Sequence, residues 1–221
     1  MRVLVVTPIL RDINGKLRLH NRAMASHYRL NWAYQLDYHQ AAGGDDYARP
    51  DVTVTRKYQE AQGVFLAGKW DALLCLESDM IVPPDALEKL VELDAPVAMA
   101  LYVFRHGKKA WNGASMLQDK TWRSLSDDPD YARAIAGNPV AVVGVGMGCT
   151  LIRRDVLEAI PFRYLKGTSC DWGFSLDCQA LDVEQVCHTG VQCGHLSIAP
   201  SPMVLWPDVS AERLYRQEFP E

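Results

Sequence analysis

The acidic triplet Glu77-Ser78-Asp79 carries the residues whose types and spacing are best suited to chemistry. It follows a nearly unbroken apolar run, Ala72–Leu76, which is typical of a strand buried on both faces in the middle of an α/β sheet. Carboxylates that are two residues apart point to the same side of an extended chain. Because carboxylate oxygens are good ligands for hard divalent cations, Glu77 and Asp79 are candidate ligands of Mn²⁺ or Mg²⁺.

A helix is predicted soon after this triplet. Pro84 and Asp85 suit a first helical turn, and leucines recur at helical spacing over residues 85–90. The acidic pair would therefore lie at the carboxyl end of a central strand, where open α/β sheets bind ligands. A cation held there can bridge a diphosphate and stabilise it as a leaving group. The alternative is that the acids are ordinary loop and helix-start residues, since both places favour polar side chains.

The elements that must position this site alternate along the chain as in an α/β domain. Apolar β-rich runs predict strands at 1–6, 34–38, 72–76, 95–103, 140–154 and 183–196. Helical patterns occupy 18–30, 52–69, 85–93, 131–136 and 155–160. The charged segment 118–138 reads as a surface excursion. The first strand is followed by Thr7-Pro8 and not by a G-x-G-x-x-G run, so a dinucleotide fingerprint is absent.

Composition narrows the class of protein further. The 221 residues suit one domain, and a net charge of −4 argues against binding polyanions over the whole surface. We expect a cytoplasmic protein, because the chain shows no apolar run long enough for a bilayer and no signal-peptide pattern at its start. None of the six cysteines forms a C-x-x-C pair, so we expect reduced thiols.

The stretch 70–90 resembles the metal-binding segment of GT-A-fold glycosyltransferases of the family 2 type, in which the triplet is the D-x-D motif. Glu77 stands where that motif has its first Asp. The glycine-interrupted strand and helix at 144–160 and the segment 169–178 resemble later parts of the same family, in the same order. In the second of these, Cys170 replaces the usual Glu of an E-D-x-x-F pattern while Asp171 is retained.

This resemblance spans residues 1–196 and implies a fold and a domain division. The fold would be a single GT-A-like (Rossmann-like) α/β domain over residues 1–199, with a central mixed, mostly parallel sheet flanked by helices. Residues 200–221 would form a C-terminal tail that packs on the domain or mediates a homodimer.

The resemblance also implies roles for particular side chains. Asp171 would be the catalytic general base that takes the acceptor proton; Asp177 fits that role less well, and a plain N-cap is the alternative for Asp171. His195 would join Glu77 and Asp79 around the metal. The competing interpretation is a zinc site, for which the ligands would be Cys187, His188, Cys193 and His195.

Two further groups complete the predicted site. The predicted nucleotide-binding residues are Thr7, Pro8, Arg56, Glu77 and Ser78. Among them, Arg56 suits a diphosphate because its planar guanidinium can make two charge-assisted hydrogen bonds. The donor and acceptor pocket would be formed by Gly146, Met147, Gly148, Trp111 and Trp172, although core tryptophan is the alternative. An acid near the second strand would also contact the nucleotide, with Asp37, Asp45, Asp46 and Asp51 as competing candidates.

The implied activity is metal-dependent transfer of a sugar from a nucleotide-diphosphate donor to an acceptor hydroxyl, with inversion. Alternatives are a nucleotidyltransferase and a non-catalytic nucleotide-sugar-binding module. The acceptor could be a glycan, a small molecule or a modified DNA base. The last is suggested only by basic residues, namely Arg18, Arg22, Arg29 and the loop 105–109.

Overall fold

The structure is a computed structural model that describes residues 1–9, 21–30, 35–41, 50–105, 107–116, 121–144, 146–197 and 202–219. For residues 35–41, 50 and 51 it describes the backbone alone. The helices are α1 Asn21–His27, α2 Pro50–Ala67, α3 Ala86–Glu92, α4 Pro129–Ile135, α5 Arg154–Ala159 and α6 Cys170–Ala180. The strands are β1 Arg2–Pro8, β2 Gln35–Ala41, β3 Ala72–Leu76, β4 Met80–Ile81, β5 Val97–Leu101, β6 Ala114–Met116, β7 Trp122–Ser124, β8 Pro139–Val142, β9 Cys149–Arg153, β10 Gln185–Gln192, β11 Gly194–Ser197, β12 Met203–Pro207 and β13 Tyr215–Glu218.

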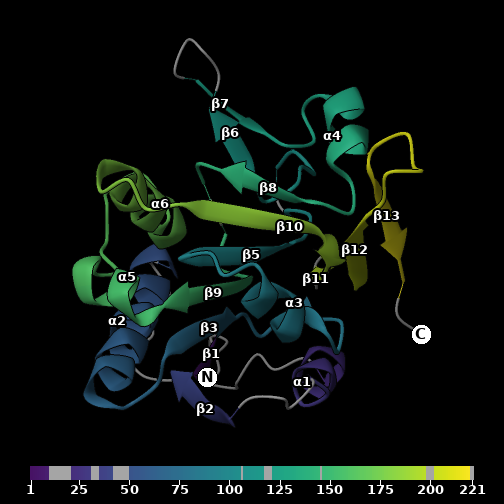
Figure 1. Cartoon of the computed structure of the whole chain (residues 1–221). Coiled ribbons are helices and arrows are strands. Elements are labelled where there is room, and N and C mark those ends of the chain that lie inside the picture. Colours follow the sequence, from purple (N-terminus) through teal and green to yellow (C-terminus); the bar gives the residue numbers. More distant parts are fainter. Residues whose placement is uncertain are drawn as a thin grey trace.

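Seven strands form the main sheet, in the order β2-β1-β3-β9-β5-β10-β8 (Figure 1). β1 pairs parallel with β2 and β3, and β5 pairs parallel with β10. β9 runs antiparallel between β3 and β5, and β8 is antiparallel to β10. Five of the seven strands therefore point the same way, which confirms the predicted mixed, mostly parallel α/β sheet.

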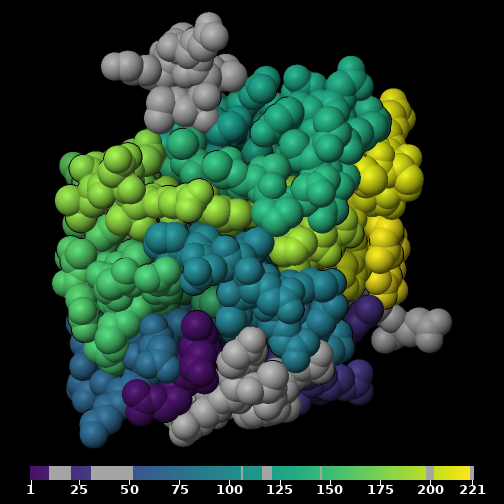
Figure 2. Space-filling model, in the orientation of Figure 1, coloured from purple at the N-terminus to yellow at the C-terminus, as the bar shows by residue number. Residues whose placement is uncertain are grey.

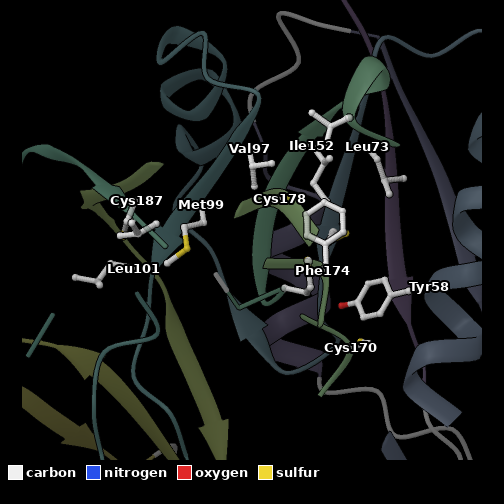
Figure 3. Packing of buried hydrophobic residues seen from close by; sticks show 14 of the residues in the cluster. Tyr58, Leu73, Val97, Met99, Leu101, Ile152, Cys170, Phe174, Cys178 and Cys187 are labelled. Atoms are coloured by element: carbon white, nitrogen blue, oxygen red, sulfur yellow. The ribbon is translucent and has the colours of Figure 1, made fainter. Parts of the chain in front are cut away.

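Alternate residues of the central strands face opposite layers of the molecule, as the pleat requires. Leu73 of β3 belongs to the apolar cluster that includes Tyr58 of α2 and Phe174 of α6 (Figure 3). Its neighbour Leu74 belongs to a second cluster, together with Leu87 of α3. Helices α2, α5 and α6 thus lie on one face and α3 on the other, so β3 is buried on both sides and its end is held rigidly.

A second sheet, in the order β13-β12-β11-β4, extends from the end of β3. Its two outer strands come from residues beyond 200, and this part of the chain lies along one side of the molecule, shown in yellow in Figure 2. The indole nitrogen of Trp111 donates to the carbonyl of Leu214 at 2.9 Å. Since β12 pairs with β11, the C-terminal segment supports the strand that carries His195.

Most predicted elements match the structure, and two differ in an informative way. Residues 183–196 were predicted as one strand, but they form β10 in the main sheet and β11 in the second sheet. Residues 140–154 were predicted as one strand, but they form β8 and β9, which are not neighbours in the sheet. The glycines between the two strands mark this break. None of the helices in the described ranges is long and apolar enough to cross a bilayer.

Candidate functional site

The acidic triplet forms a tight turn between β3 and β4. The backbone nitrogen of Met80 donates to the carbonyl of Glu77 at 3.1 Å, which closes the turn. β4 then pairs antiparallel with β11, and this places His195 opposite Met80. The backbone nitrogen of Leu196 donates to the carbonyl of Asp79 at 2.9 Å. Backbone pairing therefore brings together an aspartate and a histidine that are far apart in the sequence.

The extended conformation that we predicted for the triplet is wrong, because the turn changes where its side chains point. Glu77 accepts a hydrogen bond from the hydroxyl of Tyr58 at 3.3 Å, whereas the carboxylate of Asp79 lies beside Arg105 and His195. Among the residues that the structure describes, no three His, Cys, Asp or Glu side chains form a group that could hold a metal ion. Of the three predicted ligands, Asp79 and His195 converge, and Glu77 does not complete a cluster with them.

Asp79 and His195 nevertheless offer donor atoms that suit a divalent cation. The Nε2 atom of His195 is 3.7 Å from Oδ2 of Asp79. Nδ1 of His195 donates to the carbonyl of Val103 at 2.8 Å, so Nε2 carries the lone pair. Both Nε2 of His195 and Oδ1 of Asp79 are buried and have no hydrogen-bond partner among the residues that the structure describes. Such orphaned atoms need an explanation, and a missing ion is one of the usual ones.

The electrostatics of the site favour the metal-binding form of the histidine. Burial, reinforced by the nearby positive charge of Arg105, lowers the pKa of His195 to about 4. The ring is therefore neutral near pH 7, as a metal ligand must be. A histidine whose other ring nitrogen is held by a carbonyl is a common arrangement for metal ligands. Two protein ligands also suit a cation such as Mg²⁺ that takes further oxygens from phosphates and water.

Arg105 occupies a place in this site that the sequence did not indicate. Its Nη1 atom forms an ion pair with Oδ2 of Asp79 and also lies 3.4 Å from the carbonyl of Leu196. We had considered Arg105 only as part of a basic loop. No local pattern could have paired it with Asp79, since the contact depends on where the loop after β5 meets the turn after β3.

The glycine segment that was predicted to wall the pocket packs against Tyr102 instead. A Cβ atom on Gly146 would lie 2.0 Å from the hydroxyl oxygen of Tyr102, and one on Gly148 would lie 2.7 Å from its ring. Met147 is 1% exposed. The ring of Tyr102 in turn contacts that of His195 edge-on, with centroids 5.3 Å apart. The glycines therefore make room for a ring that braces the histidine.

Asp171, the predicted base, is the second residue of α6. The helix has Ser169 as its N-cap residue, so the alternative that Asp171 is the N-cap is wrong. Oδ1 of Asp171 accepts a hydrogen bond from the backbone nitrogen of Trp172 at 2.8 Å. Burial raises the pKa of the Asp171 carboxyl, although its hydrogen bonds oppose the shift. Asp177 is engaged elsewhere, because both its oxygens accept from Arg163, at 2.7 and 2.8 Å.

Asp171 lies in the wall of a pocket of about 420 Å³. Aromatic rings dominate this wall, and its lining includes Phe104, Trp111, Trp122, Arg123, Asp171 and Trp172. The rings of Trp122 and Trp172 meet edge-on with centroids 4.2 Å apart. Both predicted tryptophans, Trp111 and Trp172, line it, although Trp111 is only 1% exposed and is also part of the core. Gly146, Met147 and Gly148 are not among its described lining residues.

The predicted nucleotide group is only partly assembled among the described residues. Thr7 and Pro8 end β1 beside β3, and Thr7 is 2% exposed. Ser78 lies in the turn and is half-buried. Arg56 is exposed on α2, whereas its neighbour Lys57 is fully buried.

The remaining candidates are the acids near the second strand and the four residues of the zinc alternative. Asp45 and Asp46 fall outside the described residues, and for Asp37 and Asp51 the side chains do. The zinc alternative is wrong for the described chain, because its four residues do not form a metal-binding group. Cys187 and Cys193 are instead fully buried in the core, and all six cysteines are free.

Comparisons with known proteins place the fold. The sequence matches no protein-family model and no curated protein. Among solved structures, A197 from STIV aligns with a TM-score of 0.62 at 16% identity, over 100% of this chain and 96% of that chain. GalNAc-T7, solved with UDP, GalNAc and Mn²⁺, aligns with a TM-score of 0.53 at 11% identity, over 88% of this chain and 43% of that chain. The fold is GT-A-like.

A GT-A-like fold agrees with the resemblance found in the sequence, but these identities are too low to assign the family 2 type. A weaker similarity, to CMP:2-keto-3-deoxy-manno-octonic acid synthetase with CTP, has a TM-score of 0.48 at 14% identity over 85% of this chain and does not bear on function. Glu77 in the turn after β3 and Asp171 at the start of α6 interact electrostatically, so these two segments lie near each other. The chemistry must therefore be argued from these residues.

Proposed function

We propose that the protein is a glycosyltransferase that moves a sugar from a nucleotide-diphosphate donor to an acceptor hydroxyl. The observation that carries this proposal is that Glu77 interacts electrostatically with both His195 and Asp171, so that two half-sites lie near each other. One is Asp79 with the unpartnered Nε2 of His195, and the other is Asp171 in an aromatic pocket. The GT-A-like fold supports it, since GalNAc-T7 shares that fold and was solved with UDP, GalNAc and Mn²⁺.

The donor half of the proposed reaction depends on neutralising the negative charge of the leaving diphosphate. Asp79 and His195 would hold Mn²⁺ or Mg²⁺, which neutralises charge on a leaving diphosphate when it is bound. Thr7, Pro8 and Ser78 are proposed to contact the nucleotide. Glu77, held by the Tyr58 hydroxyl, is proposed to contact the nucleotide as well.

The acceptor half rests on Asp171. A hydroxyl is a poor nucleophile until its proton is removed, so a carboxylate within reach of it serves as general base. The raised pKa of Asp171 suits this role, because a base is most effective when its pKa is close to the working pH. Attack from the Asp171 side, opposite the leaving diphosphate, would invert the anomeric carbon.

The aromatic wall favours a saccharide as the acceptor. Indole faces pack well against the apolar face of a pyranose, and Trp122 and Trp172 present such surface beside Asp171. A volume of about 420 Å³ falls within the range of ligand pockets.

The test is to incubate the protein with UDP-, GDP-, CDP- and TDP-sugars and Mn²⁺, with a panel of monosaccharide and disaccharide acceptors, and to identify the products by anion-exchange chromatography and mass spectrometry. Glycosyl transfer releases a nucleoside diphosphate and depends on the acceptor. In a parallel incubation with nucleoside triphosphates and a sugar phosphate, consumption of the triphosphate with release of pyrophosphate would support a nucleotidyltransferase instead. Metal-dependent nucleotide binding without any product would favour a non-catalytic binding module.

A further inference from the structure

Arg105 holds the carboxylate oxygen of Asp79 that faces the histidine. Its Nη1 pairs with Oδ2 of Asp79, which is the atom 3.7 Å from Nε2 of His195. The other carboxylate oxygen, Oδ1, is buried and has no hydrogen-bond partner within the described part of the chain. A cation that bridges Nε2 of His195 and Oδ2 of Asp79, whether or not it also binds Oδ1, would need the oxygen that the guanidinium holds. The arginine and the cation are competitors for one atom.

The backbone just before Arg105 is held by pairing, while the side chain of Arg105 is partly open to solvent. Phe104 N donates to the carbonyl of Ala110 at 2.9 Å, and a bridge between Val103 and Trp111 closes the loop below it. The side chain of Arg105 is 30% exposed and that of Asp79 is 16% exposed. The guanidinium can therefore leave Asp79 without moving the loop, and it would remain at the rim of the site.

We propose that Arg105 is a displaceable counter-ion of Asp79 and a ligand of the donor diphosphate. This inference rests on the proposed function. Without donor, the arginine neutralises Asp79 and weakens cation binding. When cation and diphosphate arrive together, the cation takes Asp79 and the guanidinium turns to the phosphate oxygens, for which its planar fork is well suited. Cation and nucleotide then strengthen each other's binding. The cation releases the guanidinium from Asp79, and the phosphate replaces Asp79 as the partner of the guanidinium.

The experiment is calorimetric titration of Mn²⁺ into the full chain without nucleotide, followed by the same titration with UDP, GDP, CDP or TDP present. Arg105→Met keeps the length of the side chain and removes its charge. We expect it to bind Mn²⁺ about tenfold more tightly than the wild type without nucleotide, within the usual range of coupling between two ligands. We also expect it to lose most of the gain in Mn²⁺ affinity that the diphosphate gives to the wild type.

Lys108→Met is the matched control, because it removes a positive charge from the same loop. The Nζ atom of Lys108 pairs with Asp127 at 2.5 Å and not with Asp79. Its Mn²⁺ affinity should equal that of the wild type. Asp79→Asn should abolish Mn²⁺ binding in either background.

The outcomes separate this inference from the proposed function. Equal Mn²⁺ affinity of Arg105→Met and the wild type, lost on Asp79→Asn, would overturn the displacement mechanism and leave the metal site standing. If Lys108→Met gained as much Mn²⁺ affinity as Arg105→Met, the effect would come from the overall charge of the loop. That result would also overturn the displacement mechanism. Absence of Mn²⁺ binding by every variant, with and without nucleotide, would remove the metal site itself and this inference with it.

Discussion

At the scale of single residues, Asp171 differs from the neighbouring acid Asp177 in what its oxygens do. Both oxygens of Asp177 accept hydrogen bonds from one arginine, so this carboxylate is already engaged in a bidentate ion pair. Asp171 instead borders the aromatic pocket, and burial raises its pKa. A carboxylate kept in an unfavourable environment is a frequent sign of function, because the fold would be more stable without the charge.

Asp171→Asn is expected to lower kcat by about 10²–10⁴-fold, the usual contribution of a general base. The variant should bind nucleotide and Mn²⁺ as the wild type does. It should also be at least as stable near neutral pH, because a raised pKa in the folded state means that the charged carboxylate disfavours folding. Steady-state kinetics, calorimetry and thermal denaturation check the three parts. An unchanged kcat would remove Asp171 from catalysis.

The pH dependence of kcat should also reflect the raised pKa of Asp171. A general base must be deprotonated, so activity should fall as the pH drops below the pKa of Asp171. Because burial raises that pKa, the acidic limb should lie above the ordinary aspartate value of about 3.9. The measurement is kcat against pH at saturating Mn²⁺ and donor, which keeps the metal ligands from dominating the profile. A rate that stays constant down to about pH 4 would contradict the assignment.

At the scale of elements, the site depends on a stack that runs from the loop before β9 to β11. Gly146 and Gly148 lie under the ring of Tyr102, and that ring meets His195 edge-on. The backbone nitrogen of Tyr102 donates to Oδ1 of Asn112 at 2.9 Å, which fixes the strand that carries the ring. The glycines thus control the orientation of a metal-ligand candidate that they do not touch.

Gly146→Ala should disturb this stack, since its Cβ would lie 2.0 Å from the hydroxyl oxygen of Tyr102. We expect a loss of about 1–3 kcal/mol in unfolding free energy, typical of overpacking. We also expect Mn²⁺ affinity to fall by about 10–100-fold, as when the support of a metal ligand is removed. Denaturant unfolding and calorimetry measure the two effects.

Gly63→Ala is the matched control for this substitution. Gly63 lies in α2, and a Cβ there meets nothing within 4 Å. It should stabilise the protein by about 0.5–1 kcal/mol, because alanine is the better helix former. Unchanged Mn²⁺ affinity in Gly146→Ala would show that Tyr102 does not position His195.

The same elements show how far sequence reasoning reaches. Strand β3 and helices α2 and α3 could be predicted, because the apolar pattern of each lies within one short stretch of sequence. The two-residue strand β4 could not, since it exists only through its pairing with β11. The glycines were predicted to wall the ligand pocket, and nothing in the local sequence identifies Tyr102 as the ring they pack against. The ion pair of Arg105 with Asp79 was missed for the same reason.

At the scale of the whole molecule, the C-terminal segment and the charge distribution both bear on the acceptor. β12 and β13 complete the second sheet, and Arg22 of α1 pairs with Glu218 of β13 at 2.7 Å. Arg22 had suggested a nucleic-acid acceptor, as had the loop 105–109. Within the described part of that loop, Arg105 pairs with Asp79 and Lys108 pairs with Asp127. As long as no cation displaces Arg105 from Asp79, such carboxylate-paired side chains contribute little to phosphate binding.

The protein should therefore bind DNA only weakly. Non-specific binding arises from cations that displace counterions from phosphates, and the whole chain has a net charge of −4. We expect labelled single-stranded and duplex DNA to bind with a Kd weaker than about 10⁻⁴ M at physiological salt, measured by fluorescence anisotropy. Arg22→Gln should not change this result, because its partner Glu218 already neutralises it. Micromolar binding with a steep dependence on salt would contradict the saccharide assignment. Such binding needs a basic surface, whereas Arg22, Arg105 and Lys108 are paired with carboxylates.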